Sequence, residues 1–283
     1  MASPLDARNT PRHVRRMALR PARAPRRPRR SEWQETLIFL VKLVAIVFVV
    51  RSFLVSPFVI PSGSMLPRTL IGDYLFVTKW NYGYSRHSLP FSLPLIPGRI
   101  FASTPARGDV VVFKAPPTSD EDWIKRVIGL PGDTIQMRGG TLFLNGRAVP
   151  KQRVADFVLP VSPNSPCDPY FRDRAADGTP ICRYPQFEET LPGGVRYRIL
   201  DQGFSVGDDT GIYRVPAGHV FMMGDNRDDS KDSRFPDSIG YVPMTNLEGK
   251  AVVNFWSTDG NAAWLKPWTW PGATRWGRIG ELY

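Results

Sequence analysis

The chain has 283 residues and 42% of them are hydrophobic, so it can bury a sizeable core and is neither a disordered polypeptide nor a multispan membrane protein. Its 28 prolines and 24 glycines indicate many turns and short strands, which argues against a helical bundle. The net charge of +11 is concentrated in residues 1–36, which contain ten arginines against three acidic residues.

The N-terminal segment, residues 1–36, is a basic tail. Prolines interrupt it and it lacks apolar periodicity, so we expect a disordered arm. Nucleic-acid binding is the other use of such an arm, but the segment that follows favours a membrane protein and no nucleic-acid partner.

That next segment, residues 37–55, reads LIFLVKLVAIVFVVRSFLV. As a helix it would extend about 28 Å, close to the hydrocarbon thickness of a bilayer. Lys42 and Arg51 lie near its ends, where long basic side chains reach the headgroups. A buried core helix is the alternative. With the arginines upstream, we predict an anchor over residues 37–56, a cytoplasmic tail and all later residues outside.

Three targeting signals compete with a permanent anchor. A cleaved secretory signal needs a site with small residues, and VSPFVIPSGSM offers none. Arg15 and Arg16 form a twin arginine, but the apolar segment begins too far downstream for a typical export signal. An arginine-rich start also fits an organellar transit peptide, and the sequence leaves this alternative open.

Short strand-like runs separated by turn residues follow the anchor, so the predicted class is mainly β. They are GDYLFVTKW, GDVVVF, DWIKRVIG, DTIQM, TLFL, HVFMM and KAVVNFW. Residues 134–149 read as consecutive hairpins with turns at 138–140 and at Asn145-Gly146. We assign one β domain to residues 57–149 and 212–283.

Residues 150–211 differ, with many prolines and few strong strand patterns, and we predict a loop-rich inserted subdomain. Cys167 and Cys182, the two cysteines of the chain, lie in it. Outside the cytoplasm we expect them to form a disulfide, the alternative being two buried thiols. With so few cysteines and three histidines, a structural zinc site is excluded, and we expect no metal and no cofactor.

Four tryptophans, Trp264, Trp268, Trp270 and Trp276, cluster near the C-terminus. Indole rings favour the bilayer interface, but they also cap β cores, and the sequence does not decide between these two roles.

The segment IPSGSMLP, residues 60–67, places Ser62 and Ser64 around a glycine between two prolines. Such a turn could hold Ser64 exposed and fixed, although serine-glycine turns are common and usually structural. A serine nucleophile needs a base. His87 and His219 have no motif around them and read as structural residues.

A neutral lysine is the other kind of base. In DWIKRVIG, read as a strand, Lys125 lies on one face between Trp123 and Val127, where the loss of water favours the neutral amine. A surface lysine on an edge strand is the alternative. Further on, GDNRDDSKDSRF (residues 224–235) is either a solvated loop or an ion-pair network beside a site.

Taken together, PSGSM, RGDVVVF, WIKRVIGLPGD and MGDNRDDSKDSR, in this order after an apolar segment, resemble bacterial type I signal peptidase. The resemblance implies a membrane-bound serine-lysine peptidase with an antiparallel, barrel-like β domain. Its partners would be the lipid bilayer and secretory preproteins, cleaved after an Ala-X-Ala-like site. It leaves the oligomeric state open.

Residue by residue, the resemblance implies that Ser64 is the nucleophile, Lys125 the general base and Ser62 an oxyanion donor. It implies that Ser230 orients the lysine. The charged positions that support the site would be Asp225, Arg227, Asp232 and Arg234, and the shallow pockets for small side chains would be lined by Phe58, Ile60, Trp123 and Ile124.

One departure from the family pattern is an extra residue in Pro67-Arg68-Thr69-Leu70, which predicts a shifted or bulged strand after Ser64. Two other functions stay open. One is a related serine-lysine processing peptidase of the conjugation-pilin or organellar inner-membrane type. The other is a membrane-anchored β binding module with an inactive site.

Overall fold

The computed structural model describes residues 31–263 and 265–283. Most of the predicted basic tail, as well as Trp264, lies outside the described residues. The chain divides into two units, residues 1–43 and residues 44–283, and each is described by itself.

An apolar helix begins the described chain. It consists of α1 (Glu32–Val49) and a π-helical end, η1 (Val50–Leu54). Glu32 and Glu35 lie in the first turn, where negative charge interacts favourably with the helix dipole. Within residues 32–54, a stretch of 18 residues has a mean hydropathy of 2.6 and is 6% buried, so by length and composition this helix can cross a membrane.

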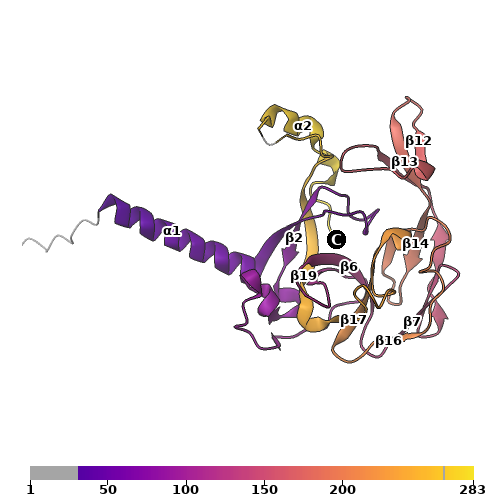
Figure 1. The fold of residues 1–283 in the computed structure, drawn as a ribbon, viewed down its shortest axis with the longest axis horizontal. Coiled ribbons are helices and arrows are strands. Elements are labelled where there is room, and N and C mark those ends of the chain that lie inside the picture. Colours follow the sequence, from indigo (N-terminus) through magenta and orange to yellow (C-terminus); the bar gives the residue numbers. More distant parts are fainter. Residues whose placement is uncertain (1–30, 264) are drawn as a thin grey trace, which may run out of the picture. The chain divides into compact units, whose positions relative to one another are not determined.

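The main sheet has seven strands in the order β1-β2-β19-β5-β6-β17-β18, all antiparallel to their neighbours. They are β1 (Val55–Val59), β2 (Asp73–Thr78), β19 (Leu247–Ser257), β5 (Val110–Lys114), β6 (Asp122–Gly129), β17 (His219–Met223) and β18 (Val242–Pro243). Figure 1 shows β2, β19, β6 and β17 in one sheet that curls, in which β5 lies between β19 and β6. The predicted antiparallel β class is confirmed.

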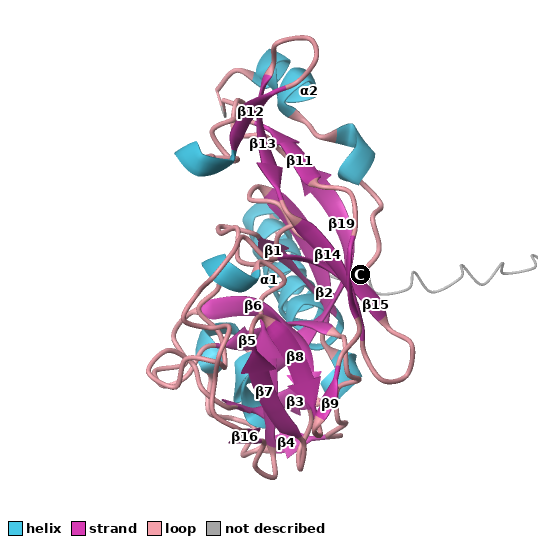
Figure 2. Ribbon diagram, turned by 90° about the vertical axis from the view of Figure 1, so that its right-hand side faces the viewer, coloured by secondary structure: helices cyan, strands magenta, loops and turns pink. Residues whose placement is uncertain are grey.

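The smaller sheets are β16-β7-β8-β9, β10-β14-β15, β11-β13-β12 and β3-β4. Their strands are β3 (Tyr84–Ser85), β4 (Arg99–Ile100), β7 (Thr134–Arg138), β8 (Thr141–Leu144), β9 (Arg147–Ala148), β10 (Lys151–Arg153), β11 (Phe157–Pro160), β12 (Arg172–Arg174), β13 (Pro180–Tyr184), β14 (Gln186–Thr190), β15 (Arg196–Leu200) and β16 (Tyr213–Arg214). In Figure 2, β11, β12 and β13 lie at one end of this unit and β7, β8 and β9 at the other.

Short helices lie between these strands and, in the case of η8, α2 and η9, after the last strand β19. They are η2 (Trp80–Tyr82), η3 (Arg86–Ser88), η4 (Pro90–Ser92), η5 (Pro169–Phe171), η6 (Arg227–Asp229), η7 (Met244–Asn246), η8 (Pro267–Thr269), α2 (Trp270–Ala273) and η9 (Trp276–Arg278).

The predicted hairpins are present. β7 and β8 pair across the turn at 139–140, and β8 pairs with β9 across Asn145-Gly146. Asn145 and Gly146 have φ values of 52° and 76°, and a two-residue turn with positive φ at both central positions matches the twist of the strands it joins.

Residues 150–211 contain six strands, β10 to β15, more than their sequence indicates. These strands are short and their exposed residues interrupt the apolar alternation, which is why the pattern is weak. Leu191, Tyr197 and Ile199 pack into the same core as Ile135 of β7 and Phe221 of β17. The segment therefore shares a core with the rest of the β domain.

The two cysteines of this segment, Cys167 and Cys182, form a disulfide, with their Cα atoms 5.7 Å apart. Both are buried and pack with Tyr184 and Leu200, with Phe171 against them. The bond ties the chain before η5 to β13.

The prediction of a bulged strand at the extra residue is wrong. Residues 61–72 form turns, so Arg68 lies between β1 and β2 and disturbs no strand. There it pairs with Glu281 at 3.2 Å, and its guanidinium lies 4.6 Å from the centre of the Tyr283 ring. A turn takes an extra residue without a change of register, because its backbone follows no ladder. The register shifts of this region lie in the pairing of β19 with β2, at 251–253 and 254–256.

Of the clustered tryptophans, Trp268 and Trp276 are 73% and 61% exposed and therefore do not fill the β core. Trp276 packs edge-on against Trp256, and the Trp270 ring nitrogen donates to the Ala263 carbonyl. The exposed rings are compatible with contact to a membrane surface, one of the two roles that the sequence left open.

Candidate active site

Ser64 lies in the turn that follows β1. The turn is tied to the charged segment 224–235 by two hydrogen bonds: the Asn226 backbone N–H donates to the Ser64 carbonyl, and the Asn226 side-chain amide donates to the Gly63 carbonyl, both at 3.1 Å. Ile60, at the start of the turn, donates its N–H to the Asp73 carbonyl at 2.9 Å. Two elements far apart in sequence therefore fix the position of this serine.

The Lys125 amine meets the Ser64 hydroxyl. Its Nζ atom lies 2.8 Å from Ser64 Oγ and 3.1 Å from the Ile124 carbonyl oxygen. As the strand period predicts, Lys125 lies between Trp123, whose ring centre is 5.3 Å from Nζ, and the fully buried Val127. Lys125 is 4% exposed, so it is not a surface lysine.

Burial is the main cause of a low pKa for Lys125, which falls from 10.5 to about 8. Three carboxylates, Asp232, Asp225 and Asp229, act in the opposite direction by stabilising the ammonium form. Because desolvation outweighs them, a useful fraction of the amine is neutral near pH 8. A neutral amine at hydrogen-bond distance from a hydroxyl can take its proton.

Ser62 is exposed, and its hydroxyl lies 3.5 Å from the Ser64 hydroxyl. An oxyanion formed by attack of Ser64 would develop next to the attacking oxygen, within the range of a Ser62 rotamer change. The structure therefore brings together the three residues Ser62, Ser64 and Lys125 that the sequence singled out.

Gly224 leaves space for close packing between Ser230 and the turn that carries Ser64. A Cβ atom added there would lie 2.2 Å from Ser230 Oγ and 2.5 Å from the Ser64 carbonyl oxygen. Ser230 is therefore within this packed region. Its hydroxyl is buried and has no hydrogen-bond partner among residues 31–263 and 265–283.

Three buried ion pairs support the charged segment. Asp225 accepts two hydrogen bonds from Arg126, at 2.7 and 2.6 Å. Arg234 donates two to Asp232, both at 2.9 Å, and Asp232 also accepts the Gly224 N–H at 3.0 Å. The segment 224–235 therefore forms an ion-pair network, one of its two predicted alternatives, and the other alternative, a solvated loop, is wrong.

The third pair joins the inserted segment to the site. Arg227 donates to Glu189 of β14 at 2.9 and 2.6 Å, and the Tyr197 hydroxyl lies 3.2 Å from the same guanidinium. Arg227 and Glu189 are 3% and 0% exposed. This pair fixes η6, which begins at Arg227 just after Asn226.

Sequence reasoning missed four of these residues: Arg126, Glu189, Asn226 and Asp229. Arg126 follows Lys125 in β6, so its side chain faces the opposite side of the strand, where a buried carboxylate partner could have been expected. Asn226 and Asp229 lie within the charged run itself. Nothing in the sequence around Glu189 indicated a contact with residue 227.

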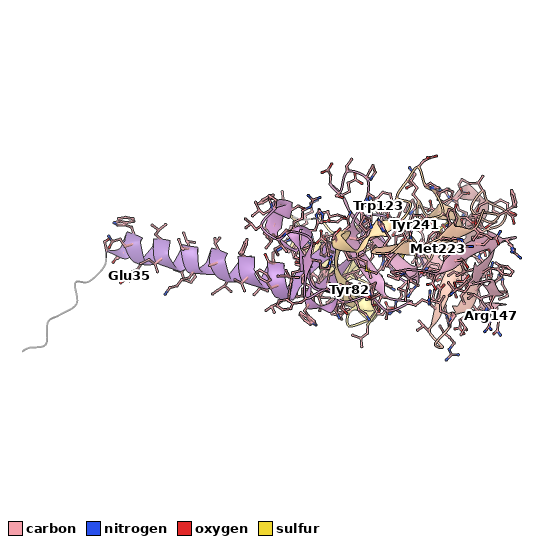
Figure 3. The ribbon with its side chains drawn as sticks, turned by 90° about the horizontal axis from the view of Figure 1, so that it is seen from below. Glu35, Tyr82, Trp123, Arg147, Met223 and Tyr241 are labelled. Atoms are coloured by element: carbon pink, nitrogen blue, oxygen red, sulfur yellow. A yellow bond between two sulfur atoms is a disulfide. The ribbon has the colours of Figure 1, made fainter. Side chains whose placement is uncertain are left out.

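Phe58, Ile60, Trp123 and Ile124 line one cavity of about 740 Å³. Ile60 and Ile124 belong to one buried cluster, with Phe58 packed against it. Trp123 of β6 and Met223 of the neighbouring strand β17 are labelled in Figure 3. The lining extends to Ile60 and Pro61, which lead into the turn that carries Ser64.

The histidines have other partners. His87 is buried, its Nδ1 atom lies 3.0 Å from Ser92 Oγ, and its Nε2 atom accepts from Arg86. Burial lowers the pKa of His87 to about 4, so its ring is neutral at pH 7. His219 contacts the Ala217 carbonyl at 2.9 Å. These contacts agree with the structural roles predicted for both histidines.

Comparisons with known proteins give a consistent result. The family model for signal peptidase, peptidase S26, matches residues 33–256. The signal peptidase I of Rickettsia typhi (strain ATCC VR-144 / Wilmington) is 38% identical over 224 residues, which cover 76% of this chain and 77% of that protein. The signal peptidase I of Rickettsia akari (strain Hartford) is 37% identical over 245 residues, covering 80% and 84%.

Among solved structures, a signal peptidase I from Enterococcus faecalis V583 is 24% identical. The match covers 52% of this chain and 97% of that chain, with a TM-score of 0.29.

Proposed function

Because this chain belongs to the signal peptidase family, peptidase S26, and is therefore a serine peptidase, we propose that it removes signal peptides from exported preproteins with Ser64 as nucleophile and Lys125 as general base. The observation that carries this assignment is the 2.8 Å approach of the Lys125 amine to the Ser64 hydroxyl in a buried setting.

The mechanism is acyl transfer. Neutral Lys125 takes the proton of Ser64, whose oxygen attacks the carbonyl carbon at the cleavage site. The Ser62 hydroxyl and the Ser64 backbone N–H stabilise the oxyanion. The lysine ammonium then protonates the leaving amine, which is the new N-terminus of the mature protein, and an acyl-enzyme remains. Water, deprotonated by the same lysine, releases the signal peptide and regenerates Ser64.

Ser230 and two ion pairs keep the Lys125 amine in position. We assign to Ser230 the hydrogen bond that orients the neutral amine, and its buried hydroxyl, which has no partner among the described residues, supports this role. The pairs Asp225–Arg126 and Asp232–Arg234 hold the segment behind the amine. Since each carboxylate is engaged by an arginine, its attraction for a lysine ammonium is weakened.

Substrate selection rests on Phe58, Ile60, Trp123 and Ile124. Their side chains leave shallow space, so residues with small side chains fit at the first and third positions before the cleaved bond, as in an Ala-X-Ala site. β1 stands at the edge of the main sheet among the described strands, and an extended segment of substrate can lie along it.

The chain is anchored by residues 37–56 in the bacterial cytoplasmic membrane, with the basic tail in the cytoplasm. Residues 57–149 and 212–283, which form the catalytic β domain, and the inserted segment 150–211 lie on the outer side. The mean hydropathy of 2.6 over 18 residues within the helix 32–54 and the ten arginines before this helix support the topology.

The test is cleavage of a secretory preprotein by the full-length protein in detergent micelles. We expect cleavage after an Ala-X-Ala site, and loss of cleavage in Ser64→Ala and in Lys125→Met. An uncleaved preprotein would favour the inactive binding module. Cleavage of a conjugation pilin precursor alone would favour the related processing peptidase. Turnover by Lys125→Met would refute the assignment of the base.

A further inference from the structure

A row of polar residues borders the apolar face of the main sheet. On that face, Leu75 and Val77 of β2, Val112 of β5 and Ile124 of β6 form part of one buried cluster. Beyond this cluster, towards one end of the sheet, the side chains are polar. In the order of the strands they are Ser56 of β1, Lys79 after β2, Glu248 of β19, Lys114 of β5 and Asp122 of β6, which we call the polar row.

The charges of the polar row alternate and are paired. Lys79 Nζ lies 2.6 Å from Glu248 Oε2, Lys114 Nζ lies 3.8 Å from Glu248 Oε1, and the same Lys114 atom lies 2.6 Å from Asp122 Oδ1. With all four ionised, two cations and two anions give no net charge; burial raises the pKa of Glu248 to about 7, so this balance holds above pH 7. Lys79 and Glu248 are 3% and 5% exposed, whereas the Asp122 side chain is 39% exposed, so the row opens to solvent at β6.

The polar row lines the same cavity as the residues assigned to substrate selection, Phe58, Ile60 and Ile124. The strand register shows where the polar row lies relative to these residues. Val112 pairs with Ile124, and Lys114 pairs with Asp122 two positions away, so both pairs share one face. On β1, Ser56, Phe58 and Ile60 also share a face. On β5 and β6 the row therefore lies one two-residue step, about 6.8 Å, from Val112 and Ile124. On β1, Ser56 lies the same step from Phe58 and pairs with Val77, so Lys79 lies one step beyond the level of Ser56.

The same spacing holds for a substrate in extended conformation. The side chains at positions −1, −3 and −5, counted back from the cleaved bond, point the same way, about 6.8 Å apart. If −1 and −3 occupy the pockets beside Ile60 and Phe58, the side chain at −5 comes to the polar row. This step rests on the function proposed above.

We propose that the polar row is a specificity-determining subsite for position −5, which selects a neutral hydrogen-bonding side chain over an aliphatic one of the same shape. The row offers both donors and acceptors. Because its charges already balance, an added charge would stay unpaired in a partly buried place, which is costly. A buried ion pair adds little to the stability of a fold compared with apolar side chains packed in the same place. Because the ion pairs of the polar row lie in the wall of the substrate cavity, we attribute to them the recognition of a substrate side chain.

The experiment uses peptides with one Ala-X-Ala junction that differ at position −5 alone. Thr is compared with Val, and Gln with Met, because each pair has nearly the same shape. For the full-length protein in detergent we expect kcat/KM to be roughly three- to tenfold higher for Thr and Gln, the effect of one net hydrogen bond. The difference should lie in KM, since this subsite is remote from the reacting carbonyl.

The double variant Lys114→Met/Asp122→Asn removes one cation and one anion and leaves Lys79 paired with Glu248. We expect it to reduce the Thr/Val ratio to about one, with kcat nearly unchanged. The matched control is Lys151→Met/Asp201→Asn, an ion pair of β10 and the segment after β15 that does not line the cavity. This control should keep the ratio of the unmodified protein.

A second measurement needs no variant and applies even if the double variant does not fold. The same Thr/Val exchange at −4 and at −6 should have little effect, because those side chains point away from the row. Equal rates for Thr and Val at −5, or the same preference at all three positions, would overturn the subsite while leaving signal-peptide cleavage intact. Failure to cleave any of the peptides would overturn both proposals.

Discussion

The replacement Lys125→Met should stabilise the protein at neutral pH while it abolishes cleavage. Burial lowers the pKa of Lys125 from 10.5 to about 8. One pKa unit corresponds to about 1.4 kcal/mol, so at pH 7 the buried ammonium costs the folded state roughly 3 kcal/mol. This cost is fully present below pH 8 and disappears as the pH rises through 10.5, the value for the unfolded chain.

Methionine has a similar length and carries no charge, but it loses the hydrogen bonds of the amine to Ser64 and to the Ile124 carbonyl. These are worth about 1 kcal/mol each. We therefore expect the variant to be more stable by roughly 1 kcal/mol at pH 7. Linkage predicts that its advantage decreases by about 2 kcal/mol between pH 7 and pH 9.5, because the lysine of the unmodified protein loses its proton over that range.

The assay is urea unfolding of the full-length protein in detergent micelles at both pH values, followed by tryptophan fluorescence. Lys266→Met, at an exposed lysine, is the control and should give a difference that does not change with pH. If Lys125→Met changes stability by the same amount at both pH values, the amine is not desolvated and the argument for a neutral base fails.

The same pKa sets the activity profile of the unmodified protein. With a value near 8, about one tenth of Lys125 is neutral at pH 7 and about nine tenths at pH 9. We expect kcat/KM to rise nearly tenfold per pH unit at low pH and to level off above pH 8. A profile that is flat from pH 6 to pH 9 would contradict this base.

Three further outcomes follow from other contacts. Ser62→Ala should lower kcat roughly a hundredfold with little change in KM in the preprotein assay, the effect of one lost oxyanion donor; an unchanged kcat would remove Ser62 from this role. Glu189→Gln should lower the free energy of unfolding by about 3–5 kcal/mol, because it leaves the buried Arg227 guanidinium without its anion, and Glu189→Met/Arg227→Met should recover part of this loss. Serine at both Cys167 and Cys182 should cost about 3 kcal/mol in urea unfolding, and a reducing agent should lower the unmodified protein to the same level.

The sequence alone was sufficient for elements that depend on local pattern. The apolar run predicted the helix that covers residues 32–54, and the alternation in DWIKRVIG placed Lys125 between Trp123 and Val127. The Asn145-Gly146 pair predicted its hairpin, because few residues other than these accept positive φ at both positions. The candidate serine and lysine came from ordered motifs, which lie within single elements.

Tertiary structure decided what depends on contacts between distant parts of the chain. Glu189 meets Arg227 because β14 packs beside the charged segment, and neither residue carries a local sign of the other. The extra residue at Arg68 is absorbed in a turn and held by Glu281, near the end of the chain. The polar row is formed by residues in, or directly after, five neighbouring strands, and the order of these strands in the sheet cannot be read from the sequence of any one of them. Local patterns fix which way a side chain faces, but only the path of the chain decides what it faces.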